Sequence, residues 1–237
     1  MNWAESVEWL RTSPLLGITV TVGAYAIGRW LHRRTGSQLA QPVLVAIILV
    51  ALFLWVFDVD YADYLIGGAY VGFWLGPATV ALAIPLHREW GHVRRHAIPV
   101  GVGIVVGAFV SVVSAVLLVQ WSGGDELIQR SMAPKAATTP VSIALAQTLH
   151  AQPALTAVVT IVAGITGAVA APAVLRLARV RDEVARGLAI GAASHGLGTA
   201  RALQESPREG AFAALSMGLS ALATSLIVPW LVPLLLQ

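Results

Sequence analysis

Residues 186–201 read Arg-Gly-Leu-Ala-Ile-Gly-Ala-Ala-Ser-His-Gly-Leu-Gly-Thr-Ala-Arg, and this stretch decides how the rest of the chain is interpreted. A histidine, His195, and an arginine, Arg201, stand in an otherwise apolar run. In a lipid bilayer ionisable residues are costly, and they usually face a protein interior or a wet cavity on a substrate or ion path. The stretch therefore predicts a polar site inside a membrane protein.

The composition indicates that the solvent of this chain is a membrane. Of its 237 residues 57% are hydrophobic and only 11% are charged, and the formal net charge is +3. Because one span needs about 20 apolar residues, the length allows about seven to eight spans and no separate soluble catalytic domain. Cysteine is absent, which excludes disulfides and thiolate chemistry. We expect one all-α, polytopic (multi-pass) helical domain over residues 1–237 in the inner (plasma) membrane, in contact with membrane lipid, and no enzyme, cofactor, metal or nucleic-acid partner.

Charge patterning predicts how the chain is threaded. Apolar runs cover residues 15–31, 39–57, 65–86, 98–119, 153–175, the opening stretch, and 210 to the C-terminus, and three of these runs are followed by arginine clusters at 29–34, 88–95 and 176–186. Cytoplasmic loops are enriched in Lys and Arg. All three clusters lie on the cytoplasmic side only if residues 140–149, a run too short to cross the bilayer, do not traverse it. We therefore predict a re-entrant segment at 138–150.

Three positions predict discontinuous helices: Pro77, Pro140 and the stretch Ser194–Gly198. Proline is favoured in the first turn of a helix, where its missing N–H costs nothing, so Pro77 and Pro140 each indicate a helix start at membrane depth, with Thr139 a candidate N-cap. The alternative is a proline kink that neighbouring helices relieve. Gly196 and Gly198 weaken the helix after His195, since glycine disfavours helix by about 1 kcal/mol relative to alanine.

The two proline-started segments also resemble each other. Residues 77–87 and 140–150 are identical at six of eleven positions, which suggests an internal repeat. In secondary transporters, paired interrupted segments in two repeats point to the substrate site. Helix N-termini offer free N–H groups to anions, and a guanidinium binds a carboxylate with two parallel hydrogen bonds. We therefore predict a small-anion site built from Thr79, Lys135, Thr138, Thr139, Ser142, Ser194, His195, Thr199 and Arg201.

Each of the two central residues has a simpler interpretation. His195 can be a structural histidine that bonds a facing helix, and Arg201 can extend to the membrane interface, because Gln204, Glu205 and Pro207 indicate that the segment is about to end. A serine hydrolase is disfavoured, since Ser194 lacks the G-x-S-x-G context and no nearby carboxylate orients His195. Gly187 and Gly191 instead form a G-x-x-x-G pair, which predicts close helix packing.

Four stretches of the sequence resemble the LrgB/CidB membrane proteins. They are Gly-Pro-Ala-Thr-Val-Ala-Leu-Ala-Ile-Pro-Leu at 76–86, Lys-Ala-Ala-Thr-Thr-Pro-Val-Ser-Ile at 135–143, the opening stretch extended to 202, and Gly-Ala-Phe-Ala-Ala-Leu-Ser-Met-Gly at 210–218. Three positions depart from the family pattern: His87 replaces a tyrosine, and Ala136–Ala137 replaces a more polar pair. Before residue 67 the resemblance is mainly one of hydropathy.

The resemblance implies two alternative functions. One is transport of a small carboxylate of the glycolate, glycerate or pyruvate kind, since the plastidal glycolate/glycerate translocator is similar to a fusion of an LrgB-type and an LrgA-type component. The other is a holin/antiholin-like role, in which the protein assembles with a small LrgA/CidA-type membrane partner, or with itself as a homo-oligomer, and influences murein hydrolase activity and lysis. The intramembrane His195 and Arg201 favour transport, because a lysis regulator has no obvious need for them.

Overall fold

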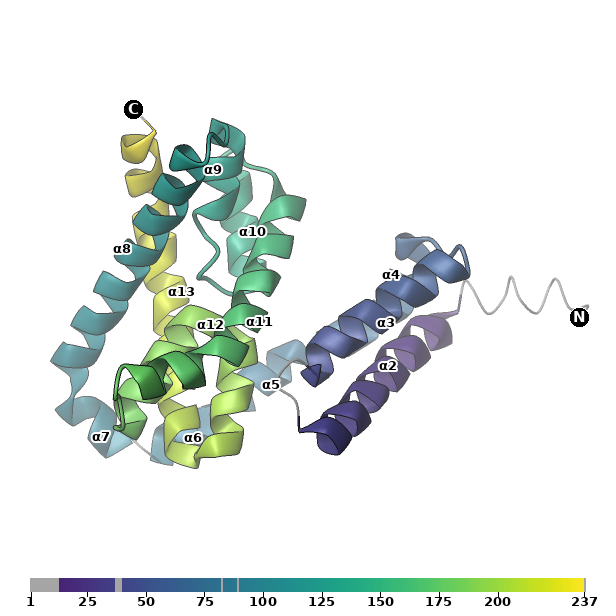
Figure 1. The fold of residues 1–237 in the computed structure, drawn as a ribbon, viewed down its shortest axis with the longest axis horizontal. Helices are drawn as coiled ribbons and strands as arrows, with labels where there is room; N and C mark the ends of the chain where they lie inside the picture. Colours follow the sequence, from purple (N-terminus) through teal and green to yellow (C-terminus); the bar gives the residue numbers. More distant parts are fainter. Residues whose placement is uncertain (1–12, 37–39, 82, 89, 237) are drawn as a thin grey trace, which may run out of the picture. The chain divides into compact units, whose positions relative to one another are not determined.

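The chain is helical throughout the residues that the computed structural model describes, which are 13–36, 40–81, 83–88 and 90–236, and these contain no strand. The chain divides into two compact units, residues 1–81 and 82–237. Figure 1 shows the helices of both units. The fold is therefore all-α, as the composition predicts.

The described part of unit 1 contains four helices. They are α2 (Pro14–Thr35), α3 (Pro42–Val56), α4 (Tyr61–Phe73) and α5 (Leu75–Ala81). Helix α4 ends at Phe73 and α5 begins at Leu75, so the interruption predicted at Gly76–Pro77 is present but begins earlier, and Pro77 lies in the first turn of α5. Helices α2 and α4 pack closely through Gly17 and Gly67, since a Cβ on Gly17 would lie 2.8 Å from Gly67 Cα.

Unit 2 contains the remaining helices. They are α6 (Ala83–Arg88), α7 (Trp90–Arg95), α8 (Ala97–Trp121), α9 (Glu126–Met132), α10 (Thr139–Thr148), α11 (Pro153–Leu177), α12 (Glu183–Glu205) and α13 (Pro207–Leu235). Helices α8 and α13 run side by side (Figure 1). One core cluster of the unit joins α8, α10 and α13 through buried side chains such as Val112, Leu145 and Val228. Helix α10 buries one face, through Ser142, Leu145 and Ala146, and leaves its other face exposed or partly exposed.

Three of the described helices are long and apolar enough to cross a bilayer: α8, α11 and α13. Helix α3 is apolar but has only 15 residues. These lengths support a membrane protein with at least these candidate spans, whereas the count of seven to eight spans stays a prediction.

The predicted close approach at Gly187 and Gly191 is confirmed. A Cβ on Gly187 would lie 2.3 Å from the carbonyl oxygen of Glu209, and one on Gly191 would lie 2.1 Å from that of Ala213. Only glycine permits this contact between the α12 and α13 backbones. The pair therefore belongs to the packing inside unit 2.

Candidate anion site at a broken helix

Helix α12 is broken at His195, in the middle of the stretch that predicted a site. His195 has φ 38° and ψ −130°, a backbone conformation that is not helical and that residues other than glycine rarely adopt. The sequence predicted the break from Gly196 and Gly198, and the structure places it on the histidine itself. Because the chain turns back there, a Cβ on Gly198 would lie 2.4 Å from Ser194 Cβ, so glycine at 198 accommodates the break. Backbone strain of this kind costs about 1–3 kcal/mol and clusters at functional sites.

Two glycines of α11 make room for the side chains at the break. A Cβ on Gly164 would lie 2.3 Å from His195 Cε1, and one on Gly167 would lie 2.2 Å from Ser194 Oγ. Sequence reasoning missed both residues. Their signal was the spacing Gly164-x-x-Gly167 within an apolar run, which also fits ordinary helix packing and so does not by itself indicate a site.

The His195 side chain is buried among polar groups that lack partners. It is 4% exposed, and its imidazole faces the backbone carbonyls of Thr160 and Lys135. Neither carbonyl makes a hydrogen bond of normal geometry with His195 Nε2. This nitrogen, Thr160 Oγ1 and Ser194 Oγ are all buried without a hydrogen-bond partner among the described residues. Thr199 Oγ1 donates to the His195 carbonyl at 2.8 Å. Unsatisfied buried polar atoms are rare in proteins, so this group is a candidate for binding a polar ligand or water.

The second half of the site is the turn before α10. Ser142 Oγ is buried and donates to Pro134 O at 2.7 Å and to Ala137 O at 3.2 Å, which holds the turn closed. Helix α10 begins at Thr139 with Thr138 as its N-cap, and the Thr138 side chain makes no capping hydrogen bond. The prediction that Thr139 is the N-cap is wrong by one residue, because Pro140 occupies the second helical position, where a missing N–H costs equally little.

The segment from α9 to α11, which includes this turn, begins and ends at the same end of α8. At its start, Ser131 Oγ accepts from Gln152 N at 3.0 Å, and Arg130 Nη1 donates to Leu149 O at 3.0 Å, so the end of α9 lies beside the end of α10 and the start of α11. Between these contacts the chain reaches Ser111, near the middle of α8, where Lys135 Nζ donates to Ser111 O at 3.0 Å and to its Oγ at 3.1 Å.

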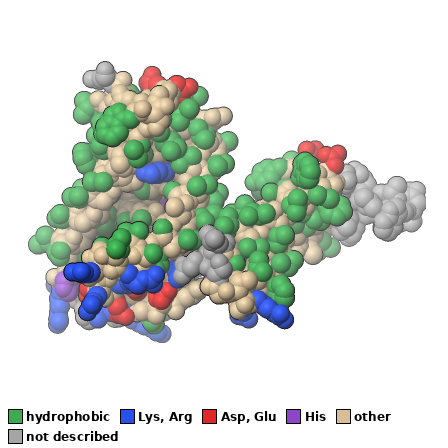
Figure 2. All heavy atoms as spheres, viewed as in Figure 1, with side chains coloured by type: hydrophobic (Ala, Val, Ile, Leu, Met, Phe, Trp, Pro, Cys, Tyr) green, Lys and Arg blue, Asp and Glu red, His purple; other side chains and the backbone are tan. Residues whose placement is uncertain are grey.

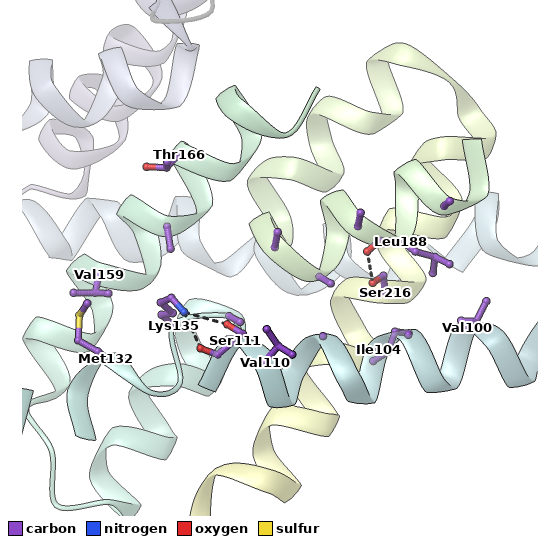
Figure 3. Close-up of a pocket in the computed structure, with 18 of the residues that line it drawn as sticks. Val100, Ile104, Val110, Ser111, Met132, Lys135, Val159, Thr166, Leu188 and Ser216 are labelled. Carbon is purple, nitrogen blue, oxygen red and sulfur yellow. Dashed lines mark hydrogen bonds between the residues drawn. The ribbon is translucent and has the colours of Figure 1, made fainter. Parts of the chain in front are cut away.

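Lys135 lines a cavity of about 870 Å³ between α8, α11 and α12. Figure 3 shows its amino group directed at Ser111. Lys135 is the chain's only lysine and the only charged side chain among the described residues that line this cavity. It forms no ion pair with an Asp or Glu of the described residues. The third hydrogen of the ammonium group is therefore available to an anion.

The structure does not bring all the predicted residues together. Lys135 and Ser142 belong to the turn before α10 and its first residues, where the partly buried Thr138 and Thr139 also lie, and Ser194, His195 and Thr199 lie at the break in α12. Of these predicted residues, Lys135 alone lines the cavity. Arg201 is absent from the cavity lining, and its Nη2 donates to Glu205 at 3.1 Å. The side chain of Thr79 lies outside the described residues. The roles assigned to Arg201 and Thr79 stay predictions.

Comparison with known proteins identifies the family. The model of the LrgB-like family matches residues 21–234. Similar proteins include the uncharacterized protein YxaC of Bacillus subtilis, 36% identical over 91% of this chain and 94% of its own length. YwbG of B. subtilis is 33% identical over 92% and 96%, and the antiholin-like protein LrgB of Bacillus mycoides is 32% identical over 93% and 96%. No solved structure matches the chain. The chain therefore belongs to the LrgB-like family of membrane proteins.

Proposed function

We propose that this protein transports a small carboxylate across the inner membrane, with the substrate bound between Lys135 and the break in α12. The observation that carries the proposal is the meeting of two discontinuous elements. The turn before α10 reaches the middle of α8 and presents the Lys135 carbonyl to His195, the residue at which α12 is broken. Discontinuous helices that line a cavity near mid-membrane are the usual substrate sites of secondary transporters.

The charge in the cavity favours an anionic substrate. The ammonium group of Lys135 stands in a lining that is otherwise uncharged, and it has no carboxylate partner among the described residues. A charge in such surroundings is stabilised by a counter-ion. Ser194, whose hydroxyl has no hydrogen-bond partner among the described residues, and His195 directly follow Ala192 and Ala193 of the cavity lining. We expect them to help select the hydroxyl or keto group of a glycolate- or pyruvate-like molecule.

Uptake of radiolabelled glycolate or pyruvate into proteoliposomes tests the proposal. Lys135→Met is expected to abolish uptake, and Lys135→Arg to retain part of it. Because Lys135 is the only lysine, reductive methylation modifies it and the N-terminal amine alone, and saturating substrate should slow its modification. Arg201→Gln tests the second predicted anion contact. Full uptake by Lys135→Met would overturn the proposal.

A holin/antiholin-like role is the second candidate, and the name of the B. mycoides relative, antiholin-like protein LrgB, favours it. Here the protein would act by assembling with a small LrgA/CidA-type membrane protein or with a second copy of itself. Gly187 and Gly191 already pack against α13 inside unit 2. Gly101 is the better probe of an external surface, because a Cβ there would meet no other atom within 4 Å. Loss of partner association and of effects on autolysis in Gly101→Leu, with neither changed in Lys135→Met, would favour this role over transport.

A further inference from the structure

A second cavity lies at the basic end of unit 2, away from the site at Lys135. It has a volume of about 530 Å³ and lies between the α11–α12 turn and the start of α13. It is lined by Arg176, Arg179, Val180, Arg181, Glu183, Arg186, Glu205, Ser206 and Glu209. Figure 2 shows that Lys and Arg side chains gather at this end, below a surface that is mostly hydrophobic.

Most of the acidic charge in this cavity is already neutralised. Glu209, 4% exposed at its side chain, accepts from Arg186 Nε at 2.9 Å, and Glu205 accepts from Arg201 at 3.1 Å. Of the remaining charged residues in the lining, one is acidic, Glu183, and three are arginines, Arg176, Arg179 and Arg181. The side chains of these three arginines make no hydrogen bond or ion pair within the described part of the chain. The open part of the cavity is therefore positively charged and unpaired.

The backbone places these arginines on one rim. Helix α11 ends at Leu177, and Arg179, two residues later, has φ 57°. The turn is closed by hydrogen bonds from Arg179 N to Arg176 O at 3.0 Å and from Val180 N to Leu175 O at 2.9 Å. Glycine is the usual residue at such a position. An arginine there keeps a guanidinium on the rim at the cost of a left-handed conformation.

We propose that this cavity binds the phosphate-bearing headgroup of an anionic lipid. Guanidinium groups bind phosphate oxygens with paired hydrogen bonds, and basic pockets between membrane helices bind acidic headgroups. The cavity is larger than a bare phosphate needs and has room for a glycerophosphate group. Val174 and Leu177, 58% and 87% exposed on the last turns of α11, offer an adjoining apolar surface for an acyl chain, which a soluble phosphate compound would not need.

Binding of short-chain lipids to the purified full-length protein tests this site. Dioctanoyl phosphatidylglycerol is the probe, with dioctanoyl phosphatidylcholine and glycerol 3-phosphate as comparisons, and native mass spectrometry counts bound molecules. We expect one phosphatidylglycerol to bind at least about tenfold more tightly than either comparison, a difference that increasing salt reduces. Equal binding of the two lipids would overturn the proposal, and so would glycerol 3-phosphate binding as tightly as phosphatidylglycerol, because the ligand would then be a soluble phosphate compound.

Variants separate the cavity from general surface charge. The double variant Arg179→Gly/Arg181→Gln removes two rim charges and places glycine where the backbone favours it, so it should fold and lose about tenfold in affinity for phosphatidylglycerol. Arg94→Gln/Arg95→Gln removes the same charge from exposed positions of the same unit outside the cavity and should bind as the unchanged protein does. Equal loss in both variants, or loss in neither, would contradict a specific site.

Discussion

At the scale of single residues, the break in α12 depends on the absence of a side chain in the facing helix. The His195 ring occupies the space in which a Cβ of Gly164 would stand. Since His195 is nearly fully buried, its ring has little freedom to move away. The conformation of His195 therefore depends on glycine at position 164.

We expect Gly164→Ala to destabilise the protein by about 1–3 kcal/mol, the cost of overpacking a filled interior, which outweighs the roughly 1 kcal/mol that alanine contributes to a helix. Gly101→Ala is the matched control, because a Cβ at Gly101 meets nothing within 4 Å, and it should stabilise α8 by up to about 1 kcal/mol. Thermal unfolding in detergent measures both. Shifts of the same sign in the two variants would contradict the packing that we describe around His195.

At the scale of elements, one ion pair with a buried carboxylate and a partly exposed guanidinium joins the first turns of α12 and α13. Arg186 and Glu209 are 17% and 4% exposed at their side chains, and Arg186 contacts both carboxylate oxygens, at 2.9 and 3.5 Å. Removing one partner of a buried pair leaves an uncompensated charge. The pair thus fixes the two helices at the end where Gly187 allows their backbones to touch.

We expect Glu209→Gln to lower the free energy of unfolding by about 2 kcal/mol, between the values for exposed and for buried pairs, because the carboxylate is buried while Arg186 is partly exposed. Glu205→Gln is the control. It makes the same chemical change four residues earlier in a partly exposed i,i+4 pair, where the cost should be below about 1 kcal/mol. Denaturant titration of both variants in mixed micelles distinguishes them, and equal costs would show that Glu209 is not held in a buried pair.

The Ser142 hydroxyl is one of the contacts that hold the turn before α10, beside the hydrogen bonds of Lys135 to Ser111 and of Ala137 N to Pro134 O. Ser142→Ala leaves the buried carbonyls of Pro134 and Ala137 with less hydrogen bonding and should cost about 1–3 kcal/mol. Thr148→Ala, on the exposed end of the same helix, should change stability by less than about 0.5 kcal/mol. The same unfolding assay applies. An unchanged stability of Ser142→Ala would mean that the turn does not depend on this contact.

These elements differ in how far the sequence predicted them. The start of α10 was predicted to within one residue, because proline and a short apolar run are local signals. The break in α12 was predicted within Ser194–Gly198 and lies in that range, at His195. The glycines that indicated it mark a weak helix, but they do not specify which residue takes the non-helical conformation. The pairing of Arg186 with Glu209 and of Arg201 with Glu205 was not predicted. Which charged side chains form a pair depends on which helices pack together, and the pattern of charges along the sequence alone does not specify that packing.

At the scale of the whole molecule, unit 2 has a consistent direction of threading. Helix α8 begins after the arginines at 94 and 95 and ends near α9, and α9 lies against the start of α11, where Thr156 Oγ1 donates to Ser131 O at 2.9 Å. Helix α11 then returns to the arginines at 176–181. If α8 and α11 are spans, as their length and hydropathy support, both basic groups lie on one side of the membrane and the segment between α9 and α11 does not cross.

Single cysteines test this threading, because the chain has none of its own and each substitution introduces a unique label. Ser122→Cys and Gln152→Cys, at exposed positions beside the ends of α8 and α10, should react with a membrane-impermeant maleimide from one side of sealed vesicles. Arg94→Cys and Arg181→Cys should react only from the other side, and the excess of arginines predicts that this side is cytoplasmic. If residues 138–150 crossed the bilayer, Gln152→Cys would label with Arg94→Cys, and Arg181→Cys would label with Ser122→Cys. That exchange would remove the re-entrant turn on which the carboxylate site at Lys135 depends.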